Sequence, residues 1–129
     1  MERLKLKYKD AQDALNTLKE ILNEPFSVII RDATIQRFEY TFEAFWKFIK
    51  EYLKEKEGII GNSPKSCFRD VFSLGFTNEE ETVELQEMTD KRNDTSHTYK
   101  EEVAQGIYKR IKDYFLLMEK VLNRFKDKI

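Results

Sequence analysis

The sequence contains very few residues that bind metals or form covalent cross-links. Among its 129 residues, Cys67 is the single cysteine and His97 the single histidine. One cysteine cannot form an intrachain disulfide, and a four-ligand zinc site has neither the cysteines nor the histidines it requires. A thiol nucleophile next to His97 is conceivable, but Cys67 lies among Pro64, Phe68 and Val71 on an amphipathic face, which favours packing. We therefore expect no metal and no cofactor.

Long apolar runs and chain breakers are also scarce. No apolar stretch approaches the roughly 20 residues of a membrane span, and residues 1–5 lack the apolar core of a signal peptide. We expect no membrane contact and a cytoplasmic location. The 4 glycines and 2 prolines fall between periodic segments, and the chain length fits one domain, which we assign to residues 1–129.

The charges of the chain nearly cancel. Lysine and arginine number 23, aspartate and glutamate 24, and the formal net charge is −1. Binding to a nucleic acid releases counterions only where basic side chains are in surplus. This composition excludes a general polyanion binder, so any contact with nucleic acid must come from a local patch or from an assembled dimer.

The first two periodic segments predict long helices. In the first, apolar residues recur at steps of 4 and 3 before Asn23-Glu24-Pro25 ends the pattern: Leu4, Tyr8, Ala11, Leu15, Leu18 and Leu22. In the second they recur at steps of 3 and 4: Ile35, Phe38, Phe42, Phe45, Ile49 and Tyr52. This second pattern predicts a helix from about Asp32 to Lys56. Trp46 and Phe48 widen its apolar surface, which suggests a second contact surface such as a dimer partner.

Capping residues mark the remaining helices. Ser63 is the expected N-cap of a short helix that stops at Gly75. Asn78 is expected to cap a fourth helix, whose first turn carries three glutamates, the charge that a positive helix end favours. Thr98 and Glu101 resemble a capping box for the last helix. The apolar positions of that helix follow at steps of 4 and 3: Val103, Ile107, Ile111, Tyr114, Met118, Val121 and Phe125.

These segments together predict the fold class. No stretch alternates with period two for long enough to indicate a strand. We therefore expect an all-α protein, an antiparallel up-down four-helix bundle with one additional short helix.

The segment 92–99, RNDTSHTY, is the best candidate for chemistry. Leu85, Met88 and Arg92 fall at i, i+3 and i+7, so Arg92 continues the buried stripe of the fourth helix and needs a partner or a ligand. His97 follows five residues later, after residues that favour a turn, so both side chains could point into one cleft. A guanidinium clamps phosphate and an imidazole exchanges protons near neutral pH, a pair that suits phosphodiester chemistry without a metal.

Spacing alone leaves a structural explanation open for the same residues. Arg92 could pair with a carboxylate such as Glu39 or Glu43, and His97 could bond a backbone carbonyl at a helix junction. Tyr99 adds a phenol that could donate a hydrogen bond, stack on a base or accept a transferred group. Lys50, Lys54 and Lys56 fit a solvated helix face.

Two stretches resemble a known family. The segment 92–99 is similar to the R-x(4–6)-H-x-Y motif of HEPN domains that are paired with minimal nucleotidyltransferases. Residues 31–47, RDATIQRFEYTFEAFWK, resemble the second-helix signature of nucleotidyltransferase substrate-binding proteins, and the short helix that begins at Ser63-Pro64 also matches. The likeness extends in order over nearly the whole chain.

The resemblance implies a homodimeric four-helix bundle encoded beside a minimal nucleotidyltransferase. Many members are toxins with metal-independent endoribonuclease activity on RNA, in which two Arg/His pairs meet across the dimer. The nucleotidyltransferase acts as antitoxin, in some systems by adding adenylate to the motif tyrosine. By position, Arg92 would clamp phosphate, His97 would be the general acid/base, Asn93 would orient the site and Tyr99 would be the modifiable hydroxyl.

Other readings remain within the same resemblance. Members were first described as substrate-binding subunits of two-component nucleotidyltransferases, so a non-catalytic regulatory subunit is the main alternative, and a plain helical adaptor is a third. Related sequences often carry a tryptophan in the fourth helix where this chain has Val83 and Leu85. We expect a repacked core there and an intact site.

Overall fold

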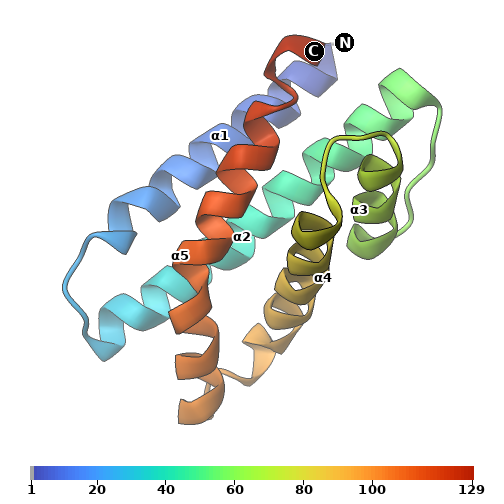
Figure 1. The fold of residues 1–129 in the computed structure, drawn as a ribbon. Coiled ribbons are helices and arrows are strands. Elements are labelled where there is room, and N and C mark those ends of the chain that lie inside the picture. Colours follow the sequence, from blue (N-terminus) through green and yellow to red (C-terminus); the bar gives the residue numbers. More distant parts are fainter. Residues whose placement is uncertain (1) are drawn as a thin grey trace.

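The computed structural model describes residues 2–129, and within that range the chain forms five α-helices and no strand (Figure 1). The helices are α1 (Glu2–Leu22), α2 (Val28–Tyr52), α3 (Pro64–Ser73), α4 (Glu79–Asn93) and α5 (Glu101–Asn123). A π-helical turn (Leu53–Glu57) extends α2, and 3-10 turns follow α4 (Asp94–His97) and α5 (Lys126–Lys128). The predicted all-α class is therefore confirmed for these residues, while the up-down four-helix bundle stays a prediction.

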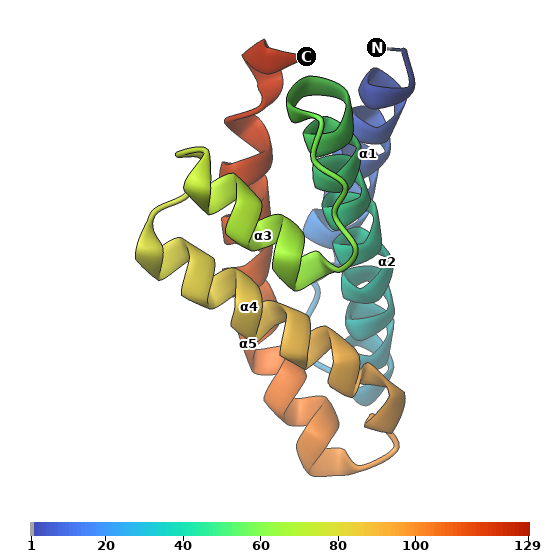
Figure 2. The same ribbon diagram turned by 90° about the vertical axis from the view of Figure 1, so that its right-hand side faces the viewer.

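The three long helices pack along one another, and the two shorter ones form a pair against them. α2 contacts both α1 and α5, α3 packs against α2, and α4 packs mainly against α5 and α3. Figures 1 and 2 show that both chain termini lie at one end of the molecule, while the connection from α4 to α5 lies at the opposite end. The motif segment 92–99 is therefore far from the termini.

The starts of α3 and α4 follow the predicted capping residues. The Ser63 hydroxyl accepts a hydrogen bond from the Ser66 N–H (3.2 Å), and Pro64 occupies the first turn of α3. The Asn78 side chain accepts from the Glu81 N–H (2.8 Å), and Glu81 accepts from the Asn78 N–H (2.9 Å), which completes a capping box at α4.

Two predicted helix starts are wrong. α2 begins at Val28 and not near Asp32, because the Ser27 hydroxyl accepts from the Ile30 N–H (3.0 Å) and caps the helix one turn earlier. Thr98 does not cap α5: its hydroxyl donates to the Thr95 carbonyl (3.2 Å), and Lys100 is the N-cap residue. Residues 98–100 therefore separate His97 from Glu101, the first residue of α5.

The aromatic side chains of α2 fill the interior of this chain. Phe38, Phe42, Phe45 and Phe48 are all fully buried, and the ring of Phe48 lies edge-on to those of Tyr8 in α1 and Phe125 after α5. A dimer partner is therefore not needed to explain the abundance of aromatic residues in α2. Trp46 differs from these four residues, because it is only partly buried.

A buried guanidinium joins α2 to the start of α5. The Arg31 side chain is 3% exposed and donates hydrogen bonds to Asp32 and to Glu101. An unpaired charge at this depth would be costly, so the two carboxylates neutralise it, and the bond to Glu101 holds the first turn of α5 against α2. That contact supports the segment immediately before α5, which includes His97 and Tyr99.

The two α4 positions at which relatives often carry a tryptophan differ in burial. Leu85 is fully buried, whereas Val83 is 62% exposed, so Leu85 supplies the core contact and Val83 faces solvent.

Over residues 2–129, no helix has the length and apolar character that a bilayer crossing requires.

Glu81 connects the start of α4 to the C-terminal end of α5. The Arg124 guanidinium donates to both carboxylate oxygens (2.7 and 2.8 Å), and the Lys120 ammonium lies 3.2 Å from Oε2. The hydrogen bonds from Arg124 outweigh the cost of burial and lower the pKa of Glu81 to about 2. The carboxylate is therefore ionised at neutral pH and contributes to stability there.

Replacing this carboxylate should make the free energy of unfolding depend less on pH in the acidic range. We expect Glu81→Gln to reduce the free energy of unfolding by about 2 kcal/mol at pH 7, because a neutral amide cannot form the bidentate ion pair with Arg124. The wild-type contribution is present above the ordinary pKa of 4.5 and is lost as the pH falls toward about 2, so the difference should narrow in acid. Urea unfolding across this pH range measures it, with exposed Glu80→Gln as control. A difference that stayed constant with pH would contradict the assignment.

Candidate functional site

The motif segment lies where α4 ends and the chain reverses toward α5. The last residue of α4 is Asn93, and the 3-10 turn of Asp94–His97 follows directly. The Thr95 hydroxyl donates to the Arg92 carbonyl (2.7 Å) in the last turn of α4, where side-chain donors commonly supplement the backbone hydrogen bonds. This turn chemistry positions Arg92 on the helix and His97 beyond it.

Arg92 extends from α4 to α2. Its Nη2 donates to Oε1 of Glu43, and its guanidinium lies 5.3 Å from the centre of the Phe42 ring. The side chain is 30% exposed, so it borders the buried stripe formed by Leu85 and Met88 but is not fully enclosed. Of the two partners that spacing suggested, the structure selects Glu43.

Glu43 also contacts two further side chains of α2. Its Oε1 accepts from Trp46 Nε1 (3.0 Å), and Lys47 Nζ lies 3.3 Å from its Oε2. Burial raises the pKa of Glu43, but the Trp46 hydrogen bond and the charges of Arg92 and Lys47 outweigh it, and the net pKa is lowered. A single carboxylate therefore links the motif arginine to the indole and ammonium groups on α2.

His97 and Tyr99 lie on the solvent side of the junction. Both are exposed, Tyr99 by 77%, and their ring centres are 6.2 Å apart in an edge-on arrangement. The ammonium of Lys100 lies 5.9 Å from the centre of the Tyr99 ring. Such exposure leaves the imidazole and the phenol accessible to a bulky ligand such as a nucleic acid or another protein.

The predicted site residues lie close together along the chain, but their side chains have different surroundings. Within residues 2–129, no hydrogen bond joins Arg92 to His97, and the imidazole does not bond a backbone carbonyl. Asn93 is exposed beside them, without a side-chain hydrogen bond in the described part of the chain. One molecule therefore presents a guanidinium bound to Glu43 and a separate, accessible imidazole.

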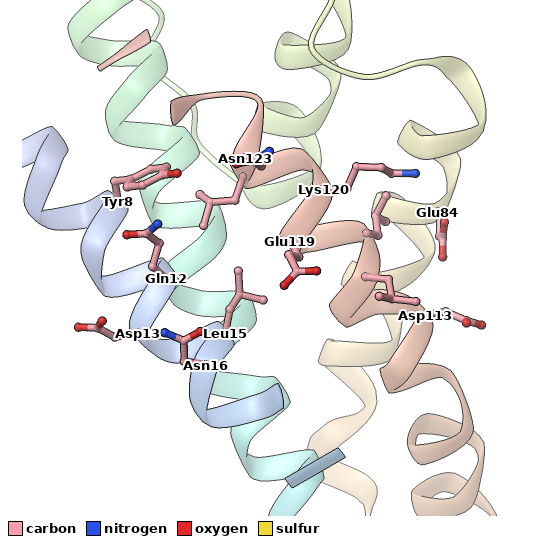
Figure 3. A pocket seen from close by; sticks show the side chains of 13 residues that line it. Tyr8, Gln12, Asp13, Leu15, Asn16, Glu84, Asp113, Glu119, Lys120 and Asn123 are labelled. Carbon is pink, nitrogen blue, oxygen red and sulfur yellow. The ribbon is translucent and has the colours of Figure 1, made fainter. Parts of the chain in front are cut away.

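A wide surface groove lies away from the motif segment. It measures about 870 Å³ and runs between α1 and α5, with Glu84 of α4 at its edge (Figure 3). Carboxylates of both helices surround it, including Asp13 and Glu119, and no motif residue contributes to its lining. Among residues 2–129, no group of three His, Cys, Asp or Glu side chains is arranged to hold a metal ion.

A second pocket contains residues that sequence reasoning missed. It measures about 420 Å³ and is lined by basic side chains of α1 and α2 together with Trp46. Spacing along α2 indicated only a solvated face at Lys50 and Lys54, because the contribution of Arg3 and Lys7 depends on how α1 packs against α2.

The Arg92–Glu43 contact predicts a measurable energetic coupling. In a double-mutant cycle of Arg92→Ala and Glu43→Ala, we expect a coupling of about 1 kcal/mol in urea unfolding, because both groups are about two-thirds shielded from solvent. The exposed Lys9–Asp13 pair is the matched control and should give less than about 0.5 kcal/mol. Equal coupling in the two cycles would contradict a specific link between α4 and α2.

Comparison with known proteins places the chain in a family. The model of the family described as nucleotidyltransferase substrate binding protein-like matches residues 6–127. The fold is similar to a crystal structure of a protein from Thermus thermophilus, with 50% sequence identity, a TM-score of 0.86 and coverage of 90% of this chain and 98% of that chain. Among curated proteins no match was found. Because the family model spans nearly the entire sequence, the chain belongs to the nucleotidyltransferase substrate-binding protein-like family.

Proposed function

We propose that this chain is the HEPN toxin of a two-gene toxin–antitoxin module, a cytoplasmic, metal-independent endoribonuclease that a minimal nucleotidyltransferase neutralises. The observation that carries the proposal is the junction of α4 and α5, where an accessible imidazole follows a guanidinium by five residues. These two groups supply proton transfer and charge stabilisation, which are the needs of RNA cleavage without a metal.

The proposed chemistry balances without any cofactor. The 2′-hydroxyl of the RNA attacks the adjacent phosphorus, the new 2′-O–P bond forms and the bond to the 5′-oxygen breaks. One His97 imidazole accepts the 2′-hydroxyl proton, and a protonated imidazole donates a proton to the leaving 5′-oxygen. Arg92 stabilises the negative charge that builds up on the phosphate oxygens. The products are a 2′,3′-cyclic phosphate end and a 5′-hydroxyl end.

Two imidazoles are required in this scheme, and one chain has a single histidine. A homodimer with two-fold symmetry would supply the second, with each copy contributing Arg92 and His97 to one composite cleft. The same symmetry would also bring together the two four-helix bundles that the family resemblance implies. Substrate phosphate would then compete with Glu43 for Arg92, which the partial exposure of this ion pair permits.

A second candidate function has its own supporting observation. In the isolated chain the charge of Arg92 is already neutralised by Glu43, as a structural arginine would be. The family description is also compatible with a non-catalytic subunit that binds a nucleotidyltransferase or its substrate. This alternative predicts a stable complex with the enzyme and no toxicity when the chain is expressed alone.

RNA cleavage separates the two candidates. We expect the wild-type chain to cut RNA in EDTA, leaving cyclic phosphate ends, and His97→Ala to lower the rate by about 10²–10⁴-fold because the proton-transfer group is gone. Gel analysis of end-labelled RNA measures both. Ser96→Ala, an exposed neighbour in the same turn, is the matched control and should retain the wild-type rate. If His97→Ala and wild type cleaved equally fast, the nuclease proposal would fail.

Modification of Tyr99 tests how the toxin is neutralised. We expect a minimal nucleotidyltransferase that is encoded beside this chain to transfer adenylate from ATP to the exposed phenol, releasing pyrophosphate. Mass spectrometry of the co-expressed protein should find the adenylated Tyr99 peptide, and Tyr99→Phe should remove it. The control is Tyr108, a partly buried residue that should stay unmodified. Recovery of only unmodified Tyr99 from a neutralised protein would reject this mechanism.

A further inference from the structure

The basic pocket between α1 and α2 has the composition of an anion site. Its lining combines the start of α1 with the second half of α2 and the loop that follows: Arg3, Lys7, Trp46, Lys47, Lys50, Glu51, Lys54, Ile60 and Gly61. Five of these side chains are cationic and one is acidic. In a chain whose net charge is −1, this is a strong local surplus of positive charge.

Most of that positive charge is not neutralised inside the pocket. Glu51 is buried and binds Arg3 through Nε (2.9 Å), which leaves the terminal amino groups of Arg3 free of any ion pair described here. Lys7, Lys50 and Lys54 likewise form no ion pair with residues 2–129. The pocket therefore presents several unpaired donors to a ligand, and its volume of about 420 Å³ is sufficient for a nucleotide-sized group.

Trp46 gives the pocket an aromatic wall in a fixed orientation. Its indole N–H donates to Glu43, and Lys50 Nζ lies 5.6 Å from the ring centre. A fixed indole among lysines is the combination that single-stranded nucleic acids use, because bases stack on the ring while ammonium groups contact the phosphates. An acidic peptide would use the lysines but would have no need of the indole face.

We propose that this pocket binds single-stranded RNA, with one base stacked on Trp46 and neighbouring phosphates contacted by Lys7, Lys50 and Lys54. Glu43 connects the pocket to the motif, since it binds both Trp46 and Arg92. Positions 43, 47 and 50 of α2 and position 54 of the π-helical turn that extends it follow one face over about 16 Å, at the usual rise per residue of a helix. The pocket would thus hold the RNA beside the cleavage site, a step that rests on the proposed function, whereas RNA binding itself does not.

Binding can be measured without cleavage in full-length His97→Ala protein. Trp46 is the single tryptophan, so its fluorescence reports directly on the pocket. We expect a short single-stranded oligoribonucleotide to quench this fluorescence, and its affinity to fall as salt rises above about 50 mM. Lys50→Ala/Lys54→Ala should weaken binding by about tenfold or more and reduce the salt dependence, because two phosphate contacts are removed.

The control has the same change in charge at a different face. Lys109 and Lys112 are exposed on α5, and Lys109→Ala/Lys112→Ala should change the affinity by less than about twofold. Equal losses in the two double variants would indicate a diffuse charge effect and would overturn the proposal. The proposal also fails if no oligonucleotide binds, or if AMP binds as tightly as the oligonucleotide, because a mononucleotide site does not need a strand.

Further outcomes separate this proposal from the ribonuclease proposal. If the wild-type protein bound the oligonucleotide but cleaved no RNA, the RNA-binding proposal would stand and the ribonuclease proposal would be rejected. If Lys50→Ala/Lys54→Ala did not affect cleavage and the oligonucleotide did not quench Trp46 fluorescence, the ribonuclease proposal would stand and the RNA-binding proposal would be rejected. Light scattering on both double variants checks that the oligomeric state is unchanged; a change specific to Lys50→Ala/Lys54→Ala would assign this face to a protein interface instead.

Discussion

The carboxylate of Glu43 holds together the polar groups on which the candidate site depends. Arg92 lies at the edge of the buried stripe of α4, and this carboxylate on α2 neutralises its partly buried guanidinium. The same carboxylate fixes the Trp46 indole and lies beside Lys47. Its lowered pKa keeps it ionised near neutral pH, so all three contacts persist under ordinary conditions. The orientation of the arginine and that of the indole are therefore coupled.

That coupling requires α2 to be held rigidly relative to its neighbours. Four phenylalanines of α2 are fully buried, and aromatic contacts to Tyr8 and Phe125 tie the helix to α1 and to the end of α5. Arg31 adds a polar connection from α2 to the first turn of α5. The 3-10 turn between α4 and α5 thus lies between two well-supported helices, while His97 and Tyr99 remain exposed beside it. A rigid frame with an accessible junction is what a site for a large substrate requires.

Sequence reasoning recovered the helices well because their periodicity and capping residues are local signals. It missed the start of α2, since Val28 and Ile29 are exposed and contribute nothing to the apolar stripe, and it assigned a cap to Thr98 that bonds backward to Thr95. Spacing offered Glu39 and Glu43 equally as partners for Arg92, because only the packing of α4 on α2 distinguishes them. Sequence patterns could not predict the basic pocket either, because Arg3 and Lys7 are about 40 residues from Trp46 in sequence and meet it only through the packing of α1 on α2.

Segregation of charge explains how a nearly neutral chain can present a basic surface. The pocket between α1 and α2 gathers five cationic side chains and one carboxylate. The groove between α1 and α5 has the opposite balance, with four carboxylates and one ammonium group: Asp13, Glu84, Asp113, Glu119 and Lys120 (Figure 3). α1 contributes to both, with Arg3 and Lys7 on one side and Asp13 on the other. A polyanion would be attracted to one face and repelled by the other, so its orientation would be set before any specific contact forms. On the basic face, the fixed indole of Trp46 is the proposed contact for a base of single-stranded RNA, and Glu43 links this indole to Arg92.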